Sequence, residues 1–159
     1  MLRPFREDEL DELVQQTKAA PAYIGGKPSR ERLANRIESS GLFVDGRLDL
    51  AVEFEETLAG SIQARAAAQA LPPGVCELGI QVDAQLRGRG IGTEAVVILT
   101  EHLLENGFPR VQASTDISNT AMRRALERAG FVYEGTMRRF MPDGDERADY
   151  ALYARTASD

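Results

Sequence analysis

The chain has 159 residues, of which 43% are hydrophobic and 28% charged, a composition that is ordinary for one globular domain. Its net charge of −6 argues against general nucleic-acid binding, and no apolar run reaches the roughly 20 residues of a membrane span. The single cysteine, Cys76, excludes an internal disulfide and a cysteine-rich metal site. We therefore expect one domain over residues 1–159, in the cytoplasm, with no membrane or nucleic-acid partner and no metal.

The first half of the chain predicts two helices and several short strands. Apolar residues recur at helical spacing after Glu7 and again after Ser29, whose side chain can cap a helix. The Asp45-Gly46 dipeptide is typical of a hairpin turn. In chain order we predict a strand over Leu2–Phe5, a helix over Glu7–Lys18, a loop over Ala20–Pro28, a helix from Ser29 to Gly41, strand segments over Leu42–Phe54, and a strand or a helix over Ser61–Ala70.

The second half predicts strands that alternate with helices and end in a hairpin. This order indicates a mixed sheet with helices on its faces. We predict a turn over Pro72–Gly74, a strand over Val75–Val82, a helix over Gly92–Asn106, a strand over Val111–Thr115, a helix capped by Ser118 or Asn119 that ends at Gly130, and strands over Phe131–Met141 and Arg147–Tyr153.

The most informative segment is the glycine-rich connection between residues 83 and 93. Glycines at 88, 90 and 92 let backbone N–H groups converge, and the helix that follows adds the positive end of its dipole. Such a turn is typical of an anion site, most often for phosphate, although some glycine-rich turns only connect a strand to a helix. A P-loop would need Lys followed by Ser or Thr after its last glycine, but here Thr93 follows Gly92. A dinucleotide fingerprint would need two residues between its second and third glycines, but here only Ile91 separates Gly90 from Gly92.

The pattern Gln85-x-x-Gly88-x-Gly90 resembles the acyl-CoA signature of the GCN5-related N-acetyltransferase (GNAT) superfamily. The segment 119–131 resembles the second cofactor helix of that superfamily, and the ending over 133–153 is similar to the ribosomal-protein-alanine N-acetyltransferase-like subgroup. The resemblance implies an α/β fold, with a twisted, mixed, mostly antiparallel sheet of about seven strands and about four helices. It also implies direct acetyl transfer from acetyl-CoA to a primary amine, on a protein N-terminus or a small molecule. The sequence leaves the oligomeric state open, with a homodimer as one alternative.

The resemblance also assigns the cofactor to particular residues. Backbone amides of Ile80 and Val82 would lie near the thioester, and residues 87–93 would hold the pyrophosphate. Asn119 would cap its helix and bind the cofactor arm, while Arg123, Arg124 and Arg128 offer further cations. The predicted cofactor-binding residues are Ile80, Val82, Arg87, Gly88, Arg89, Gly90, Ile91, Gly92, Thr93 and Asn119.

Glu77 is the predicted catalytic base. An ordinary lysine-type amine has a pKa of about 10.4, so a proton must leave before the nitrogen can attack. Strand alternation places Glu77, Gly79 and Gln81 on one face of their strand, just upstream of the glycine loop. The resembled subgroup uses a glutamate at this position as its base. The alternative is a glutamate at the strand end that only reaches solvent.

The sequence leaves the proton donor to the departing thiolate open. The resembled subgroup has a serine where this chain has Met122, and other branches have a tyrosine where it has Leu126. Both residues belong to an apolar helical stripe and are expected to pack in the core. Water, Tyr150 and Tyr153 remain as donors, although such tyrosines more often pack in a hairpin.

Charge is unevenly distributed along the chain. Residues 1–86 carry 9 basic and 14 acidic side chains, residues 87–139 carry 8 and 6, and residues 140–159 carry 2 and 5. This is either chance or a cationic cofactor half facing an anionic half suited to a cationic amine. Because Met122 and Leu126 replace the usual donors, the alternative function is a non-catalytic acyl-CoA-binding sensor or regulatory module.

Overall fold

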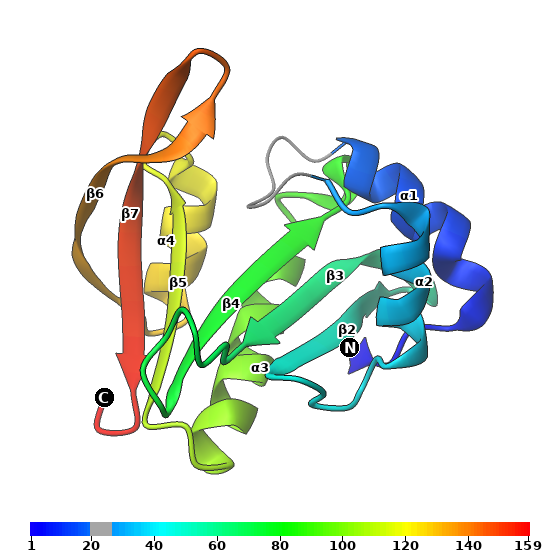
Figure 1. The fold of residues 1–159 in the computed structure, drawn as a ribbon, viewed down its shortest axis with the longest axis horizontal. Coiled ribbons are helices and arrows are strands. Elements are labelled where there is room, and N and C mark those ends of the chain that lie inside the picture. Colours follow the sequence, from blue (N-terminus) through cyan, green and yellow to red (C-terminus); the bar gives the residue numbers. More distant parts are fainter. Residues whose placement is uncertain (20–26) are drawn as a thin grey trace.

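The computed structural model describes residues 1–19 and 27–159 (Figure 1). The described part forms a seven-stranded mixed sheet in the order β1-β2-β3-β4-β5-β7-β6, with α1 and α2 on one face and α3 and α4 on the other. The predicted α/β architecture, a mixed sheet of seven strands with helices on both faces, is thus confirmed. The strands are β1 Leu2–Arg3, β2 Arg47–Phe54, β3 Thr57–Arg65, β4 Val75–Val82, β5 Arg110–Asp116, β6 Val132–Asp143 and β7 Glu146–Thr156; the helices are α1 Leu10–Ala19, α2 Arg30–Glu38, α3 Ile91–Glu105 and α4 Thr120–Arg128, with short 3-10 helices at Glu7–Glu9 and Ala84–Leu86.

Helix starts agree with the capping signals. The Ser29 hydroxyl accepts the Arg32 N–H at 3.3 Å at the start of α2, and Asn119, rather than Ser118, accepts the Met122 N–H at 3.1 Å at the start of α4. A side-chain oxygen that binds an otherwise free helical N–H stabilises the first turn. No helix in the described part is long and apolar enough to cross a membrane.

The first hairpin lies later than the sequence indicates. Strands β2 and β3 are joined at Glu55 and Glu56, which have φ angles of 48° and 63°. Glutamate seldom adopts this left-handed conformation, so local propensity gives no sign of the turn, which the long β2–β3 pairing imposes. Asp45-Gly46 forms only a tight turn closed by one bridge. Most of the loop predicted over 20–28 lies outside the described residues.

Two apolar cores lie on opposite faces of the sheet. The larger one packs α3 and α4 against the central strands, with Val96, Leu99 and Leu126 each at most 1% exposed. The smaller one packs α1 and α2 against β2 and β3 through Leu13, Leu33 and their neighbours. Helices therefore pack on both faces of the sheet. This packing holds the strands in the register that positions the site residues.

A buried charge cluster fastens α2 to β2. The Asp49 carboxylate is 4% exposed and accepts hydrogen bonds from Arg36 at 2.6 and 2.9 Å and from Arg47 at 2.5 and 2.9 Å. Burial by itself would raise the pKa of this carboxyl. The hydrogen bonds and positive charges of the two guanidinium groups outweigh burial and hold the pKa of Asp49 below its ordinary value.

We expect Asp49→Asn to lower the free energy of unfolding by about 3 kcal/mol at pH 7, because two arginines lose a buried counter-charge. Because the pKa of Asp49 is lowered in the folded state, the carboxylate stabilises the fold when the pH is above its unfolded-state pKa of about 3.9. This stabilisation is lost as the pH falls through the folded-state pKa. The difference from wild type should therefore narrow in acid, which urea unfolding at pH 7 and pH 3 measures.

Asp11→Asn is the control, because Asp11 forms an exposed ion pair with Arg30. Such pairs contribute less than about 1 kcal/mol. Equal losses in the two variants, or a difference that widens in acid, would contradict this account of the Asp49 cluster.

Candidate active site

The central feature of the sheet is the separation of β4 from β5. These parallel strands pair only from Val75↔Arg110 to Leu78↔Ala113, although β4 continues to Val82 and β5 to Asp116 (Figure 1). On its other side β4 stays paired with β3, and β5 with β7. Beyond Leu78 the two halves of the sheet therefore part, and one edge of β4 faces a gap.

The backbone of β4 presents the two predicted amides to this gap. The Asp83 N–H donates to the Ala59 carbonyl of β3 at 2.8 Å. Because N–H groups alternate in direction along a strand, those of Ile80 and Val82 point away from β3, toward the β5 side. The Val82 carbonyl, which accepts from Arg87 Nε at 3.1 Å, points the same way. These amides can thus donate to a carbonyl lying between the strands.

The glycine loop leaves open space in front of the first turn of α3. Gly88 and Gly90 have φ angles of 78° and 82°, and a Cβ added to either would meet no atom within 4 Å. Gly90 is the N-cap residue of α3, so the unpaired N–H groups of the first turn of α3 lie beside the loop. Converging N–H groups and the helix dipole together suit a phosphate.

A cleft of about 940 Å³ runs from this loop through the gap to the α2 side of the sheet. Its size lies within the range of small-molecule sites, roughly 300–1,000 Å³. All the predicted site residues line it except Arg89, whose guanidinium lies 5.8 Å from the centre of the Phe54 ring. Arg124 and Arg128 of α4 line its cofactor end.

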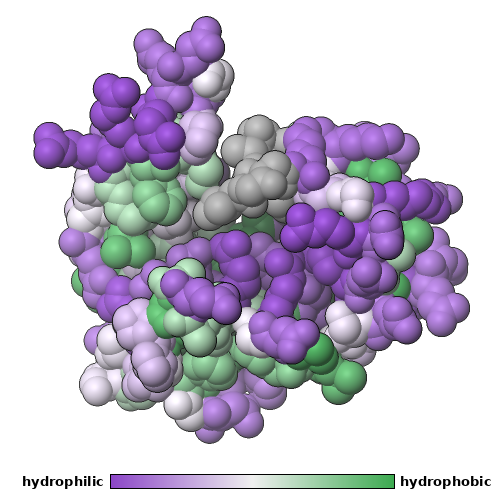
Figure 2. Space-filling model, viewed as in Figure 1, coloured by the Kyte–Doolittle hydropathy of each residue, from purple (hydrophilic) through white to green (hydrophobic). Residues whose placement is uncertain are grey.

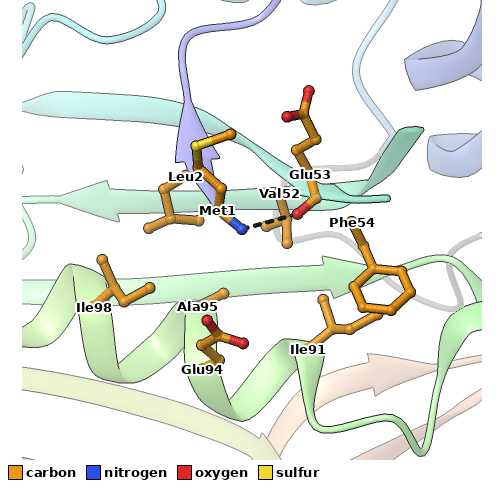
Figure 3. Close-up of a pocket in the computed structure, with 9 residues that line it drawn as sticks. All are labelled: Met1, Leu2, Val52, Glu53, Phe54, Ile91, Glu94, Ala95 and Ile98. Carbon is orange, nitrogen blue, oxygen red and sulfur yellow. Dashed lines mark hydrogen bonds between the residues drawn. The ribbon is translucent and has the colours of Figure 1, made fainter. Parts of the chain in front are cut away.

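A second cavity lies between β1, β2 and the start of α3 (Figure 3). It has about 20 Å³ and is lined by residues such as Phe54 and Ile98, with the Met1 amino group donating to the Glu53 carbonyl beside it at 2.9 Å. That volume holds no more than a water molecule. The large cleft is therefore the candidate active site.

Glu77 is held in position from both sides within the cleft. Its carboxylate accepts from Arg65 Nη2 of β3 at 2.7 Å and from Gln112 Nε2 of β5 at 3.3 Å. The register Arg65↔Glu77↔Gln112 places the three residues in one row across adjacent strands. With 23% of its side chain exposed, Glu77 is accessible from the cleft while its orientation is fixed.

The two candidate tyrosines have different surroundings. Tyr153 is fully buried, and its hydroxyl accepts from Arg123 at 3.1 Å and donates to Glu127 at 3.0 Å. Arg123 and Tyr153 thus fasten α4 to β7, and Arg123 does not line the cleft with the other α4 arginines. Met122 lines the cleft and packs against the larger core.

Tyr150, by contrast, lines the cleft, and its hydroxyl has no hydrogen-bond partner among the described residues. Burial and the negative charges of Asp116 and Asp143 raise its pKa above the ordinary value for tyrosine. The phenol therefore stays protonated at neutral pH and can donate.

The α2 end of the cleft carries an excess of positive charge that the sequence analysis missed. Four arginines lie there with two carboxylates, so the α2 end of the cleft is not an anionic region. Counts along the chain fail because they do not tell which charges face a cleft. The sequence did contain a signal for this charged surface. Charged or amide residues occupy alternate positions of β2 and β3, and alternation along a strand places them on one face of the sheet. The cleft is lined here by Arg32, Arg36, Arg47, Gln63, Arg65 and Glu77, and the second carboxylate is Asp49, which binds Arg36 and Arg47.

Residues 1–132 match the family model described as the Acetyltransferase (GNAT) domain. The chain belongs to the GNAT acetyltransferase family. This confirms the predicted acetyltransferase class, with acetyl-CoA as the acyl donor. No curated protein sequence gives a significant match.

Solved GNAT structures share the fold over the whole chain. RimL, a ribosomal L7/L12 alpha-N-protein acetyltransferase in complex with coenzyme A, is 19% identical, with 99% of this chain and 94% of that chain covered and a TM-score of 0.80. The ribosomal-protein-S18-alanine N-acetyltransferase from Escherichia coli is 18% identical, with 99% of this chain and 93% of that chain covered and a TM-score of 0.74. A chimera of the spermidine N-acetyltransferase SpeG from Vibrio cholerae and hSSAT is 15% identical, with 99% of this chain and 96% of that chain covered and a TM-score of 0.80. At these identities the likeness shows the fold alone.

We expect Gly90→Ala to weaken binding of coenzyme A by at least about tenfold, because a side chain would occupy the space in front of the loop amides. Gly107→Ala is the matched control. Gly107 follows the other end of α3 with a φ of 96°, and a Cβ there also meets no atom within 4 Å, so the backbone strain is similar. Calorimetric titration measures both affinities. The loop would not be the phosphate site if both variants bound coenzyme A equally well.

Proposed function

We propose that this GNAT protein transfers the acetyl group of acetyl-CoA directly to a primary amine, with Glu77 as the general base. The observation that carries the proposal is the continuity of the cleft. It joins the glycine loop to the Glu77 carboxylate through the gap between β4 and β5. A donor held at one end and an amine entering from the other would meet beside Glu77.

The residues at the cofactor end fit acetyl-CoA, which when bound supplies an activated acetyl thioester. Amides of residues 87–93 would hold the pyrophosphate, with Arg87, Arg124 and Arg128 nearby as counter-charges. The N–H groups of Ile80 and Val82 would donate to carbonyl groups along the gap. Because Asn119 Oδ1 caps α4, its Nδ2, which has no partner among the described residues, can donate into the cleft.

Glu77 would act on the acceptor. An amine arrives mostly protonated at neutral pH, and the carboxylate would take one proton so that the nitrogen can attack the thioester carbon. The new C–N bond forms as the C–S bond breaks. The nitrogen releases its remaining extra proton to solvent, and the departing sulfur takes up a proton and leaves as a thiol. Arg65 and Gln112 keep the carboxylate aimed at the gap during these steps.

Direct transfer is supported by the state of the only cysteine. Cys76 is fully buried in the larger core, on the strand face opposite to Glu77. Burial raises the pKa of its thiol to about 11, so a thiolate nucleophile is scarce at neutral pH. An acyl-cysteine route through Cys76 is therefore disfavoured.

Tyr150 is our proposed proton donor to the leaving sulfur. It lines the cleft with an unpartnered hydroxyl among the described residues, and its raised pKa keeps it protonated. Met122 lines the same cleft but has no proton to donate.

Glu77→Gln should lower kcat/KM for amine acetylation by about 10²-fold at neutral pH, the lower end of general-base effects. The loss should shrink at high pH, where free amine is abundant. Glu134→Gln is the control, because Glu134 is also paired with an arginine, Arg110, but lies outside the cleft. A loss that stays constant with pH would make Glu77 a structural residue. Wild-type protein that binds coenzyme A yet acetylates no amine would favour the sensor alternative.

Tyr150→Phe should lower kcat by at least about tenfold while the affinity for coenzyme A stays unchanged, because general acids contribute to the transition state. Tyr133→Phe serves as control, since the Tyr133 hydroxyl contacts Thr136 away from the cleft. An unchanged kcat in Tyr150→Phe would show that water protonates the sulfur.

A further inference from the structure

We propose that the amine acceptor also carries an anionic group, a carboxylate or a phosphate, which binds to arginines at the α2 end of the cleft. The inference rests on the proposed function, because it concerns the acceptor of that reaction. It comes from the arrangement of charge across the sheet face beneath α2.

One row of side chains links the base to the cationic end. Residues Arg47, Arg65 and Glu77 are directly opposite one another on β2, β3 and β4, so their side chains lie on the same face. Neighbouring strands are about 4.8 Å apart, which puts the Cα atoms of Arg47 and Glu77 about 10 Å apart. A small molecule can span that distance.

Much of the positive charge at this end is not neutralised. Arg65 is paired with Glu77, whereas Arg36 and Arg47 share the single carboxylate of Asp49. Both of these arginines bind Asp49 through Nε and Nη2, and Arg47 Nη2 also binds Gln63. Among the described residues, Nη1 of each arginine has no hydrogen-bond partner and can bind a ligand.

Arg32 adds a further positive charge from α2. It is exposed and lines the cleft, and its guanidinium group has no hydrogen bond or ion pair with any residue that the structure describes. The cluster of Arg32, Arg36, Arg47 and Asp49 thus has two positive charges in excess. Hydrophilic side chains gather on the side of the molecule that carries α1 and α2 (Figure 2).

This charge selects among acceptors. A guanidinium group binds a carboxylate or phosphate through paired hydrogen bonds, whereas a second ammonium group at this end would be repelled by the excess positive charge. With the reacting nitrogen at Glu77, the anion would lie on the order of 5–10 Å away, given the strand spacing and the side-chain lengths. Amino acids whose amine and carboxylate are separated by two or more carbons, phosphorylated amines and peptides with an acidic second residue fit, and polyamines do not.

The test compares acceptors that carry an anionic group with partners that lack it, using acetyl-CoA and the full chain. The pairs are β-alanine against β-alaninamide, phosphoethanolamine against ethanolamine, and a peptide beginning Ala-Asp against one beginning Ala-Asn, with putrescine as the dication. We expect at least one anionic member to exceed its neutral partner by about tenfold or more in kcat/KM, and putrescine to be the poorest. The pair with the largest ratio identifies the source of the anion.

Arg32→Gln should raise KM for the preferred anionic acceptor by about five- to tenfold and bring its ratio to the neutral partner toward one. Arg30→Gln is the control, because Arg30 lies on the same helix but pairs with Asp11 outside the cleft. Neutral or dicationic acceptors that match or exceed the anionic ones, or equal effects of the two substitutions, would overturn the inference and leave the transfer reaction standing.

A different outcome distinguishes failure of the proposed transfer reaction from failure of the anion-site inference. If the protein binds coenzyme A but acetylates none of these amines, the transfer reaction fails. The inference is then decided by calorimetry on the coenzyme A-loaded protein. Tighter binding of β-alanine or phosphoethanolamine than of its neutral partner, weakened in Arg32→Gln, supports the anion site, and equal or weaker binding overturns it.

Discussion

The short parallel pairing of β4 with β5 is the constraint on which the rest of the structure depends. A parallel pair needs a crossover, here α3, and the connection into α3 is the glycine loop at the end of β4. Each strand is also held by an antiparallel partner on its outer side, and sheet twist turns the two halves apart. The gap, the exposed amides of β4 and the start of α3 therefore come from one topological feature.

The two faces of the sheet have different chemistry, and the gap joins them. Behind β4, apolar side chains of α3 and α4 form the larger core and support the loop rigidly. Beneath α2, the sheet carries arginines and carboxylates at alternate positions. Burying such charges is costly unless they are paired, and Asp49 with its two arginines meets that condition. A rigid wall for the cofactor thus lies beside a polar surface for the acceptor.

The Arg65–Glu77 ion pair connects the acceptor surface to the proposed chemistry. It fixes the carboxylate at the mouth of the gap and removes one arginine from the positive excess, so the remaining charge lies farther from the base. On the opposite side of the cleft, α4 uses Met122 and Leu126 for packing. The proposed proton donor is instead Tyr150 of β7, which lines the cleft in register with Asp116 at the end of β5.

By itself the sequence determined the features that depend on neighbouring residues. The caps at Ser29 and Asn119, the strand over Val75–Val82 and the glycine loop are set by local hydrogen bonds and side-chain periodicity, and resemblance added the role expected of Glu77. Tertiary structure alone decided which distant residues share a face. The turn at Glu55–Glu56, the row from Arg47 to Glu77 and the opening of Tyr150 into the cleft all follow from strand register, which pairs segments far apart in the chain.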